Sequence, residues 1–243
     1  MAEAVRFLLG HEPREVRGFD PNLTVLNWLR EAERCTGTKE GCAEGDCGAC
    51  TVVLGEPDGD RVRYRAVNAC ILFMAQLHGK QLITVEHLRR PDGSLHPVQQ
   101  AMVECHGSQC GFCTPGFVMS LFALYHCAGE PDRQRILDAL AGNLCRCTGY
   151  RPIIDAARRM YELGDDDHFS EREAETAARL MALIDGDRLG FTHGGKRYFA
   201  PRRIDDLAAL YAQFPDATLL AGGTDVGLWV TKQHRDLDTL IYV

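Results

Sequence analysis

The sequence predicts an α+β protein in three parts: a small sheet domain, a domain of four short helices and the beginning of an α/β domain. Three observations predict this class. Runs rich in Val and Ile surround one helical run up to Glu86, the period becomes helical after Arg90–Gly93, and a strand–helix pattern returns from Phe191. With 243 residues, 45% hydrophobic and 25% charged, the chain lies within the range of globular proteins.

Residues 1–88 are predicted to form the sheet domain. One helix is expected at Thr24–Glu33, with Thr24 near its cap, and a turn is expected at Gly10–Pro13. A loop rich in Gly and Cys follows the helix. The strand-like runs are Val5–Leu9, Arg14–Phe19, Thr51–Leu54, Val62–Val67 and Leu82–Glu86.

Residues 89–164 are predicted to form the helical domain, because glycine-bearing loops separate four runs of helical period. Two of these runs begin just after a cysteine pair, with Pro115 and Pro152 in the first turn. This similarity indicates two related helical hairpins. The expected helices are Pro97–Cys105, Pro115–Cys127, Arg133–Ala141 and Pro152–Leu163.

Residues 165–190 are predicted to be a linker, because the charge of Asp165–Thr176 favours solvent over a core. Residues 191–243 then begin a new unit. After a strand-like start, we expect a helix at Ile204–Phe214, a strand at Thr218–Leu220, a glycine-rich turn, a short helix and a strand at Leu240–Val243.

The charge and the apolar stretches restrict the partners. The net charge is −7, and no Arg pair extends into a basic patch, so nucleic acid is not expected. Met1–Gly10 lacks the features of a secretory signal, and the longest apolar stretch, Phe117–Tyr125, is too short to span a bilayer. We therefore expect a cytoplasmic protein without a membrane partner, in which clustered cysteines hold metal rather than form disulfides.

The first cysteine set has the spacing C-x4-C-x2-C followed by a distant fourth cysteine, which is the spacing of plant-type [2Fe–2S] ferredoxins. Gly41, Gly45 and Gly48 permit unusual dihedral angles and allow backbone N–H groups to point toward the sulfurs. Such donors stabilise the more negative, reduced state. The four residues are Cys42, Cys47, Cys50 and Cys70.

The second set is Cys110, Cys113, Cys145 and Cys147, and both pairs stand shortly before predicted helices. Helix N-termini lower thiol pKa values and stabilise an anionic cluster. Taken alone, this C-x2-C…C-x-C pattern fits zinc as well as iron–sulfur. The ferredoxin-like neighbour favours a second iron–sulfur cluster.

The other cysteines and the histidines receive simpler interpretations. Cys35, Cys105 and Cys127 lack partner motifs and are expected to be free structural cysteines. The nine histidines show no ligand spacing, so none is assigned to a metal. Near the C-terminus, Leu219–Gly227 has a Gly-Gly turn between strand and helix, which allows close approach to a phosphate. Taken alone, such a segment is more often a simple turn, and it does not match G-x-G-x-x-G.

Together these motifs resemble the small iron–sulfur/FAD subunit of bacterial xanthine dehydrogenases, in the molybdenum hydroxylase family. The resemblance runs from about Val5 to Val243 and is most specific at Thr38–Val52, Gln109–Gly116 and Gly142–Tyr150. It implies a ferredoxin-like β-grasp domain with one [2Fe–2S] cluster, a four-helix domain with a second, and the N-terminal part of an FAD-binding domain. The molybdenum cofactor would lie on a separate large subunit.

The resemblance also implies site roles. The two cysteine sets ligate the two clusters, and Gln109 and Cys147 face the pterin of the molybdenum cofactor. The family's small subunit continues beyond Val243, so the FAD site is expected to be incomplete here unless another chain carries the rest. The residues that match the FAD pyrophosphate loop are Leu219, Leu220, Ala221, Gly222, Gly223, Thr224 and Asp225.

The predicted function is electron transfer in a hetero-oligomeric xanthine dehydrogenase, from the partner's molybdenum cofactor through two clusters to FAD and NAD during purine hydroxylation. No catalytic residue is expected in this chain. One alternative is the iron–sulfur chain of another molybdenum hydroxylase, acting on aldehydes, carbon monoxide or N-heterocycles. Another is an interaction module stabilised by two four-cysteine zinc sites.

Overall fold

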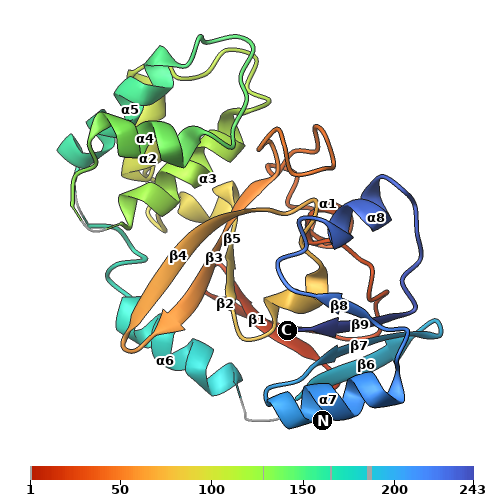
Figure 1. Cartoon of the computed structure of the whole chain (residues 1–243). Coiled ribbons are helices and arrows are strands. Elements are labelled where there is room, and N and C mark those ends of the chain that lie inside the picture. Colours follow the sequence, from red (N-terminus) through yellow and green to blue (C-terminus); the bar gives the residue numbers. More distant parts are fainter. Residues whose placement is uncertain (1, 128, 165, 185–187) are drawn as a thin grey trace.

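A computed structural model describes residues 2–127, 129–164, 166–184 and 188–243. Figure 1 shows the sheet domain in the middle of the molecule, the helical domain against one end of it and the C-terminal unit on another side. This arrangement confirms the α+β class and the order of its three parts.

The sheet domain holds five strands in the order β2-β1-β5-β3-β4. Strands β1 and β5 are parallel, and the remaining neighbours are antiparallel. The strands are β1 (Val5–Leu9), β2 (Glu12–Val16), β3 (Thr51–Asp58), β4 (Arg61–Asn68) and β5 (Gln81–Ile83), with 3-10 helices η1 (Met74–Leu77) and η2 (Val85–Leu88).

Two predicted strands are displaced in the structure. Strand β2 begins at Glu12, before the expected Arg14, because Gly10 adopts a φ of +58° and the chain reverses directly after it. Strand β5 ends at Ile83 instead of Glu86, since the chain turns into η2. Helix α1 (Val25–Glu31) lies where it was predicted, and the Thr24 hydroxyl accepts from the Asn27 N–H at 3.3 Å.

The helical domain packs around one buried helix. Its helices are α2 (Pro97–Glu104), α3 (Thr114–Tyr125), α4 (Arg133–Leu140) and α5 (Arg151–Glu162). Every α3 residue from Gly116 to Tyr125 is buried, and α3 contacts the other three helices as well as β3 and β4. The four predicted helices are confirmed to within two residues at their ends.

The predicted solvated linker is wrong for the part that the structure describes. Asp167, His168 and Phe169 are buried, and α6 (Glu173–Leu183) packs against β1, β3 and β4. Asp165, Asp185, Gly186 and Asp187 lie outside the described residues. The acidic charge did not prevent burial, because His96 and His126 of the helical domain form hydrogen bonds with the Asp167 carboxylate.

The C-terminal unit is a four-stranded sheet in the order β6-β7-β9-β8 with two helices. The Asn22 side chain clamps it to the sheet domain through hydrogen bonds to the backbone N–H and C=O of Leu237 at 2.9 and 3.0 Å. The two units also share one hydrophobic core. The elements are β6 (Leu189–His193), β7 (Lys196–Ala200), α7 (Ile204–Gln213), β8 (Thr218–Leu220), α8 (Val226–Thr231) and β9 (Thr239–Tyr242). No helix in the described part of the chain is both long and apolar enough to cross a membrane.

Candidate functional site

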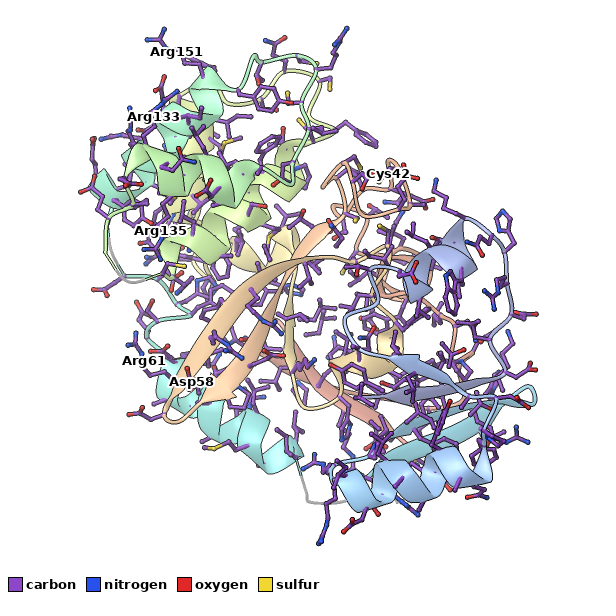
Figure 2. All side chains as sticks on the ribbon, in the orientation of Figure 1. Cys42, Asp58, Arg61, Arg133, Arg135 and Arg151 are labelled. Atoms are coloured by element: carbon purple, nitrogen blue, oxygen red, sulfur yellow. The ribbon has the colours of Figure 1, made fainter. Side chains whose placement is uncertain are left out.

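The first cysteine set lies at the end of the β3–β4 hairpin. The loop 41–50 precedes β3, and the hairpin register pairs Thr51 with Asn68, which brings Cys50 beside Cys70. In Figure 2, Cys42 marks this loop, which lies between the helical domain and α8. The structure thus brings the first four predicted residues together.

Backbone N–H groups point at the sulfurs of this loop. The Cys42 sulfur accepts from the N–H groups of Glu44 and Cys47, both at 3.4 Å, and these bonds lower its pKa although burial opposes them. Donation from Cys70 lowers the pKa of Cys50 to about 7, and the same interaction raises the pKa of Cys70. Cys42 and Cys50 therefore favour the thiolate, the form that ligates metal, whereas burial raises the pKa of the Cys47 thiol.

The glycines of this loop leave room that a side chain would fill. A Cβ at Gly41 would lie only 2.8 Å from the Cys47 sulfur. Gly45 and Gly48 have φ angles of +84° and +69°, which strongly favour glycine. Converging thiols, sulfur-directed N–H groups and a glycine-lined wall fit a compact inorganic cluster.

The second set lies on the helical domain. Cys113 is the N-cap of α3, while Cys145 and Cys147 precede α5. The Thr148 hydroxyl and N–H donate to Cys145 and lower its pKa to about 7 against the effect of burial. Burial, together with the Cys145 thiol, raises the pKa of Cys113 to about 12.

A surface hollow of about 490 Å³ lies beside this set, and its wall includes all four cysteines, Phe112, Leu144 and Tyr150. Cys110 and Cys147 are exposed to solvent. The Gln109 side chain donates to the Cys147 carbonyl at 3.1 Å, so the two residues expected to face the pterin lie together.

The thiols of both sets are arranged in pairs. Among the described residues, no three cysteine sulfurs lie within 4.8 Å of one another. The group of three possible ligand atoms that does lie this close consists of His96, His126 and Asp167. Four thiolates around one tetrahedral zinc would all lie about 3.8 Å apart, whereas a [2Fe–2S] cluster takes two thiolates at each iron. The paired thiols are Cys42/Cys47, Cys50/Cys70, Cys110/Cys147 and Cys113/Cys145, which favours binuclear clusters.

A short bridge joins the two sets. The Leu144 N–H, directly before Cys145, donates to the carbonyl of Cys47 at 3.0 Å. The buried Asn143 side chain donates to Gly48 and accepts from Ser120. A Cβ at Gly116 would collide with the Gly48 carbonyl, so the two domains approach each other through bare backbone.

Sequence reasoning did not assign a role to several residues around the sulfurs. The Tyr150 hydroxyl accepts from the Cys145 N–H at 2.9 Å, and Asn68 donates to the Gly45 carbonyl at 2.7 Å. The stretch Gly142–Tyr150 had been noted as specific, but its asparagine, threonine and tyrosine carry no metal-ligand signal of their own. Their roles depend on the folded loop.

The predicted flavin loop connects β8 to α8. Thr224 and Asp225 are exposed, and Gly223 has a φ of +94°. Leu220 is fully buried in the core, so its side chain supports the loop from within. The Gln76 side chain donates to the Ala221 carbonyl at 3.1 Å and ties the loop to the sheet domain.

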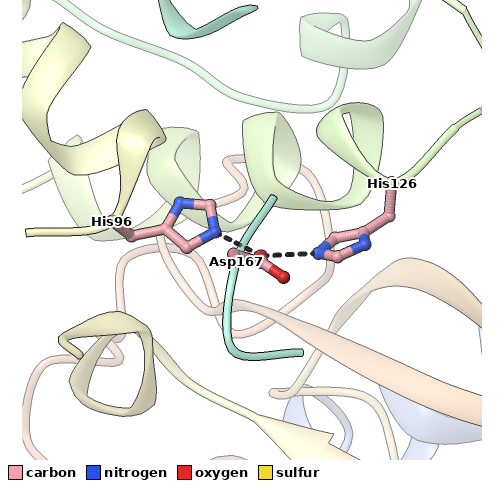
Figure 3. Close-up of side chains that lie close together, drawn as sticks. All are labelled: His96, His126 and Asp167. Atoms are coloured by element: carbon pink, nitrogen blue, oxygen red, sulfur yellow. Dashed lines mark hydrogen bonds and ion pairs between the residues drawn. The ribbon is translucent and has the colours of Figure 1, made fainter. Parts of the chain in front are cut away.

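A largely buried cluster is formed by His96, His126 and Asp167, none of which belongs to the cysteine sets (Figure 3). The Nε2 atoms of His96 and His126 donate to the same Asp167 oxygen at 2.6 and 3.0 Å. His96 Nδ1 accepts from the Val98 N–H, so the neutral ring carries its proton on Nε2 and offers no lone pair to a metal there. The cluster therefore holds the segment around Asp167 to α2 and α3 by hydrogen bonds.

Comparison with protein families identifies two segments. Residues 84–158 match a [2Fe-2S] binding domain, and residues 191–243 match the FAD binding domain in molybdopterin dehydrogenase. With the fold and the thiol geometry, these matches define an iron–sulfur flavoprotein.

Individual relatives agree. The chain is 36% identical to xanthine dehydrogenase of Calliphora vicina and 50% identical to aldehyde oxidase 1 of Rattus norvegicus, over 88% and 86% of its length. It spans about a fifth of those relatives, 19% of each. Quinoline 2-oxidoreductase from Pseudomonas putida 86 is 32% identical with a TM-score of 0.55, over 72% of this chain and 96% of that chain. The chain belongs to the molybdenum hydroxylase family and corresponds to the iron–sulfur and flavin-binding region of its members.

Proposed function

We propose that this chain is the electron-transfer region of a cytoplasmic xanthine dehydrogenase. The proposed reaction is hydroxylation of a purine, hypoxanthine or xanthine, with NAD as the acceptor. The molybdenum cofactor would lie on a partner subunit of a hetero-oligomer. The observation that carries the proposal is the paired arrangement of thiols in two sites joined by a backbone bridge.

The proposed ligands divide by domain. Cys42, Cys47, Cys50 and Cys70 would hold one [2Fe–2S] cluster on the sheet domain, and Cys110, Cys113, Cys145 and Cys147 a second on the helical domain. Leu219–Asp225 would hold the FAD pyrophosphate. When bound, the clusters supply one-electron chemistry and the flavin pairs electrons.

The residues of this chain would support that chemistry without reacting. The N–H donors at Cys42 and Cys145 stabilise negative charge on sulfur. The bond from Leu144 to Cys47 fixes the spacing of the two sites and gives a short bonded route between them. Gln109 and Cys147, at the exposed edge of the second site, would face the partner's pterin.

Xanthine dehydrogenases of three flies are among the relatives, at 35–36% identity, which supports the proposed parent enzyme. The order of iron–sulfur domains followed by a flavin segment on one chain also supports it. Aldehyde oxidase is the second candidate, because aldehyde oxidase 1 of Rattus norvegicus is 50% identical. Both candidates assign the same role to this chain and differ in substrate and acceptor.

Visible absorption and metal analysis test the cofactors. We expect a red-brown protein with about four irons per chain, whose visible bands bleach on addition of dithionite. A colourless chain with two zinc ions would support the zinc module and contradict the proposal.

Steady-state assays of the complex purified with its natural partner test the reaction. We expect xanthine-dependent reduction of NAD. Oxidation of aldehydes without xanthine turnover would favour the aldehyde oxidase alternative. Mass spectrometry of the same complex would identify the molybdenum-bearing subunit and any further flavin-binding chain.

A further inference from the structure

We propose that Ile71 is a positioning residue that seats the flavin loop on the first cysteine site, so that cluster assembly at this site orders the loop. The inference rests on the proposed function and extends it by one residue. Ile71 follows Cys70 directly and is buried. It lies where the cysteine site and the C-terminal unit meet.

On the flavin side, two glycines lie against Ile71. A Cβ at Gly223 would lie 2.8 Å from the Ile71 carbonyl oxygen, and one at Gly227 would lie 2.8 Å from both the Ile71 carbonyl oxygen and the Ile71 Cβ. Real Cβ atoms do not approach other atoms so closely. The start of α8 therefore rests on the backbone of Ile71.

On the cysteine side, Ile71 closes over Gly45. A Cβ at Gly45 would lie 2.7 Å from the Ile71 Cδ1. The Asn68 side chain, two residues before Cys70, donates to the Gly45 carbonyl at 2.7 Å. Gly45 thus contacts both the residue that supports the flavin loop and the end of the strand that leads to the proposed ligand Cys70.

Two further contacts join the same surfaces. Gln76, buried near the seat, accepts from the Phe73 N–H at 2.9 Å and donates to the Ala221 carbonyl at 3.1 Å. Lys232 and Glu44 lie 3.6 Å apart in a partly exposed ion pair, which contributes little to stability. The buried contacts at Ile71 and Gln76 are therefore the main connection between the flavin loop and the first cysteine site.

The connection has a thermodynamic consequence. If cluster assembly fixes Cys70, it also restricts Ile71 and favours the seated flavin loop. Because coupling between two sites is reciprocal, a seated loop must favour cluster retention by the same factor. The second site does not contact Ile71 in any described interaction and is not expected to take part.

Gly227→Ala tests the contact between α8 and Ile71. Alanine normally stabilises a helix interior relative to glycine, but here its Cβ must displace Ile71. In the full chain, we expect cluster assembly to slow amide hydrogen exchange in residues 221–228 by about tenfold and Gly227→Ala to abolish that slowing. Leu228→Ala is the matched control, because Leu228 lies on the same helix outside the hydrophobic core that contains Ile71.

Two more variants keep the test independent of any folding defect in Gly227→Ala. Cys47→Ser, which removes a proposed ligand of the first cluster, should abolish the slowing, while Cys147→Ser at the second site should leave it unchanged. Ile71→Val, which removes only the Cδ1 atom over Gly45, should reduce the slowing.

Equal amide exchange rates of residues 221–228 in iron-loaded and iron-free protein would contradict the role proposed for Ile71. They would leave the proposed function standing. A chain that assembles no cluster would contradict both.

Discussion

The two cysteine sites differ in how much of each is enclosed by this chain. In the first, Cys50 and Cys70 are each 2% exposed, and glycine backbone and the flavin segment surround the loop. In the second, Cys110 and Cys147 are exposed, and Phe112 and Leu144 are 48% and 57% exposed. Exposed apolar side chains gathered at one site indicate an interaction surface. The first site thus has two buried ligands, Cys50 and Cys70, beside the partly exposed Cys42 and Cys47. The more exposed second site is the side on which we expect the partner.

The strongest test separates the two sites by removing one ligand. Cys47→Ser should abolish or alter one of two EPR-detectable [2Fe–2S] species and leave the other, because the sites use different thiols. Iron content would fall from about four to about two per chain. Cys35→Ser, outside both sets, is the control and should leave both signals. Two unchanged signals in Cys47→Ser would contradict the assignment.

Chelation should distinguish the sites by exposure. In the chain without its partner, an iron chelator under reducing conditions should empty the second site on the order of ten times faster than the first, because exposed ligands need no local opening. EPR spectra recorded over time would follow each species. Loss of both signals at one rate would show that enclosure of the first site does not protect it.

A matched pair of glycine substitutions tests the tightness of each wall. Gly41→Ala places a Cβ 2.8 Å from the Cys47 sulfur, while Gly142→Ala, beside the second site, meets no atom within 4 Å. We expect Gly41→Ala to lower the free energy of unfolding by about 1–3 kcal/mol and Gly142→Ala to change it by less than about 0.5 kcal/mol. Urea unfolding measures both, and equal effects would mean that the first site has unfilled space.

The smallest expected effect is a pH dependence of the helical domain's attachment. Burial lowers the pKa of His96 below 6.5 despite the Asp167 carboxylate, so the unfolded chain binds the extra proton and stability falls as the pH drops below 6.5. The pKa of Asp167 lies far below its ordinary 3.8: burial opposes this, but the donors His126 and His96 outweigh it. The contribution of Asp167 is therefore complete above 3.8 and is lost below that pH.

Urea unfolding at pH 7.5 and 5.0 checks this dependence. His96→Gln should reduce the difference between the two pH values, and the exposed His193→Gln should not. Burial also lowers the pKa of His11, to about 4, so part of the difference should remain in His96→Gln. An unchanged difference in that variant would contradict the contribution of His96.

Local patterns predicted much of this molecule, since strand and helix periods, the Thr24 cap and the cysteine spacings are properties of neighbouring residues. The prediction of a solvated linker was wrong because the burial of Asp167 depends on His96 and His126, which lie far from it in sequence. Likewise, the Gly-Gly turn predicted a loop. The need for glycine at position 227 could not be predicted, because it arises from the close contact with Ile71 in the folded chain. For the second cysteine set, spacing alone left zinc and iron–sulfur open. The ferredoxin-like neighbour favoured iron–sulfur, and the folded pairing of the thiols supports the same assignment.

The bare contact between Gly116 and Gly48 has a consequence for how such proteins can diverge. Each glycine belongs to a different domain, and a side chain at Gly116 would strike the Gly48 carbonyl. A chimera that takes its helical domain from a homologue must therefore bring a glycine at this position or rebuild the opposing loop. The two domains are expected to be inherited as a pair, with exchange between lineages tolerated only where this contact survives.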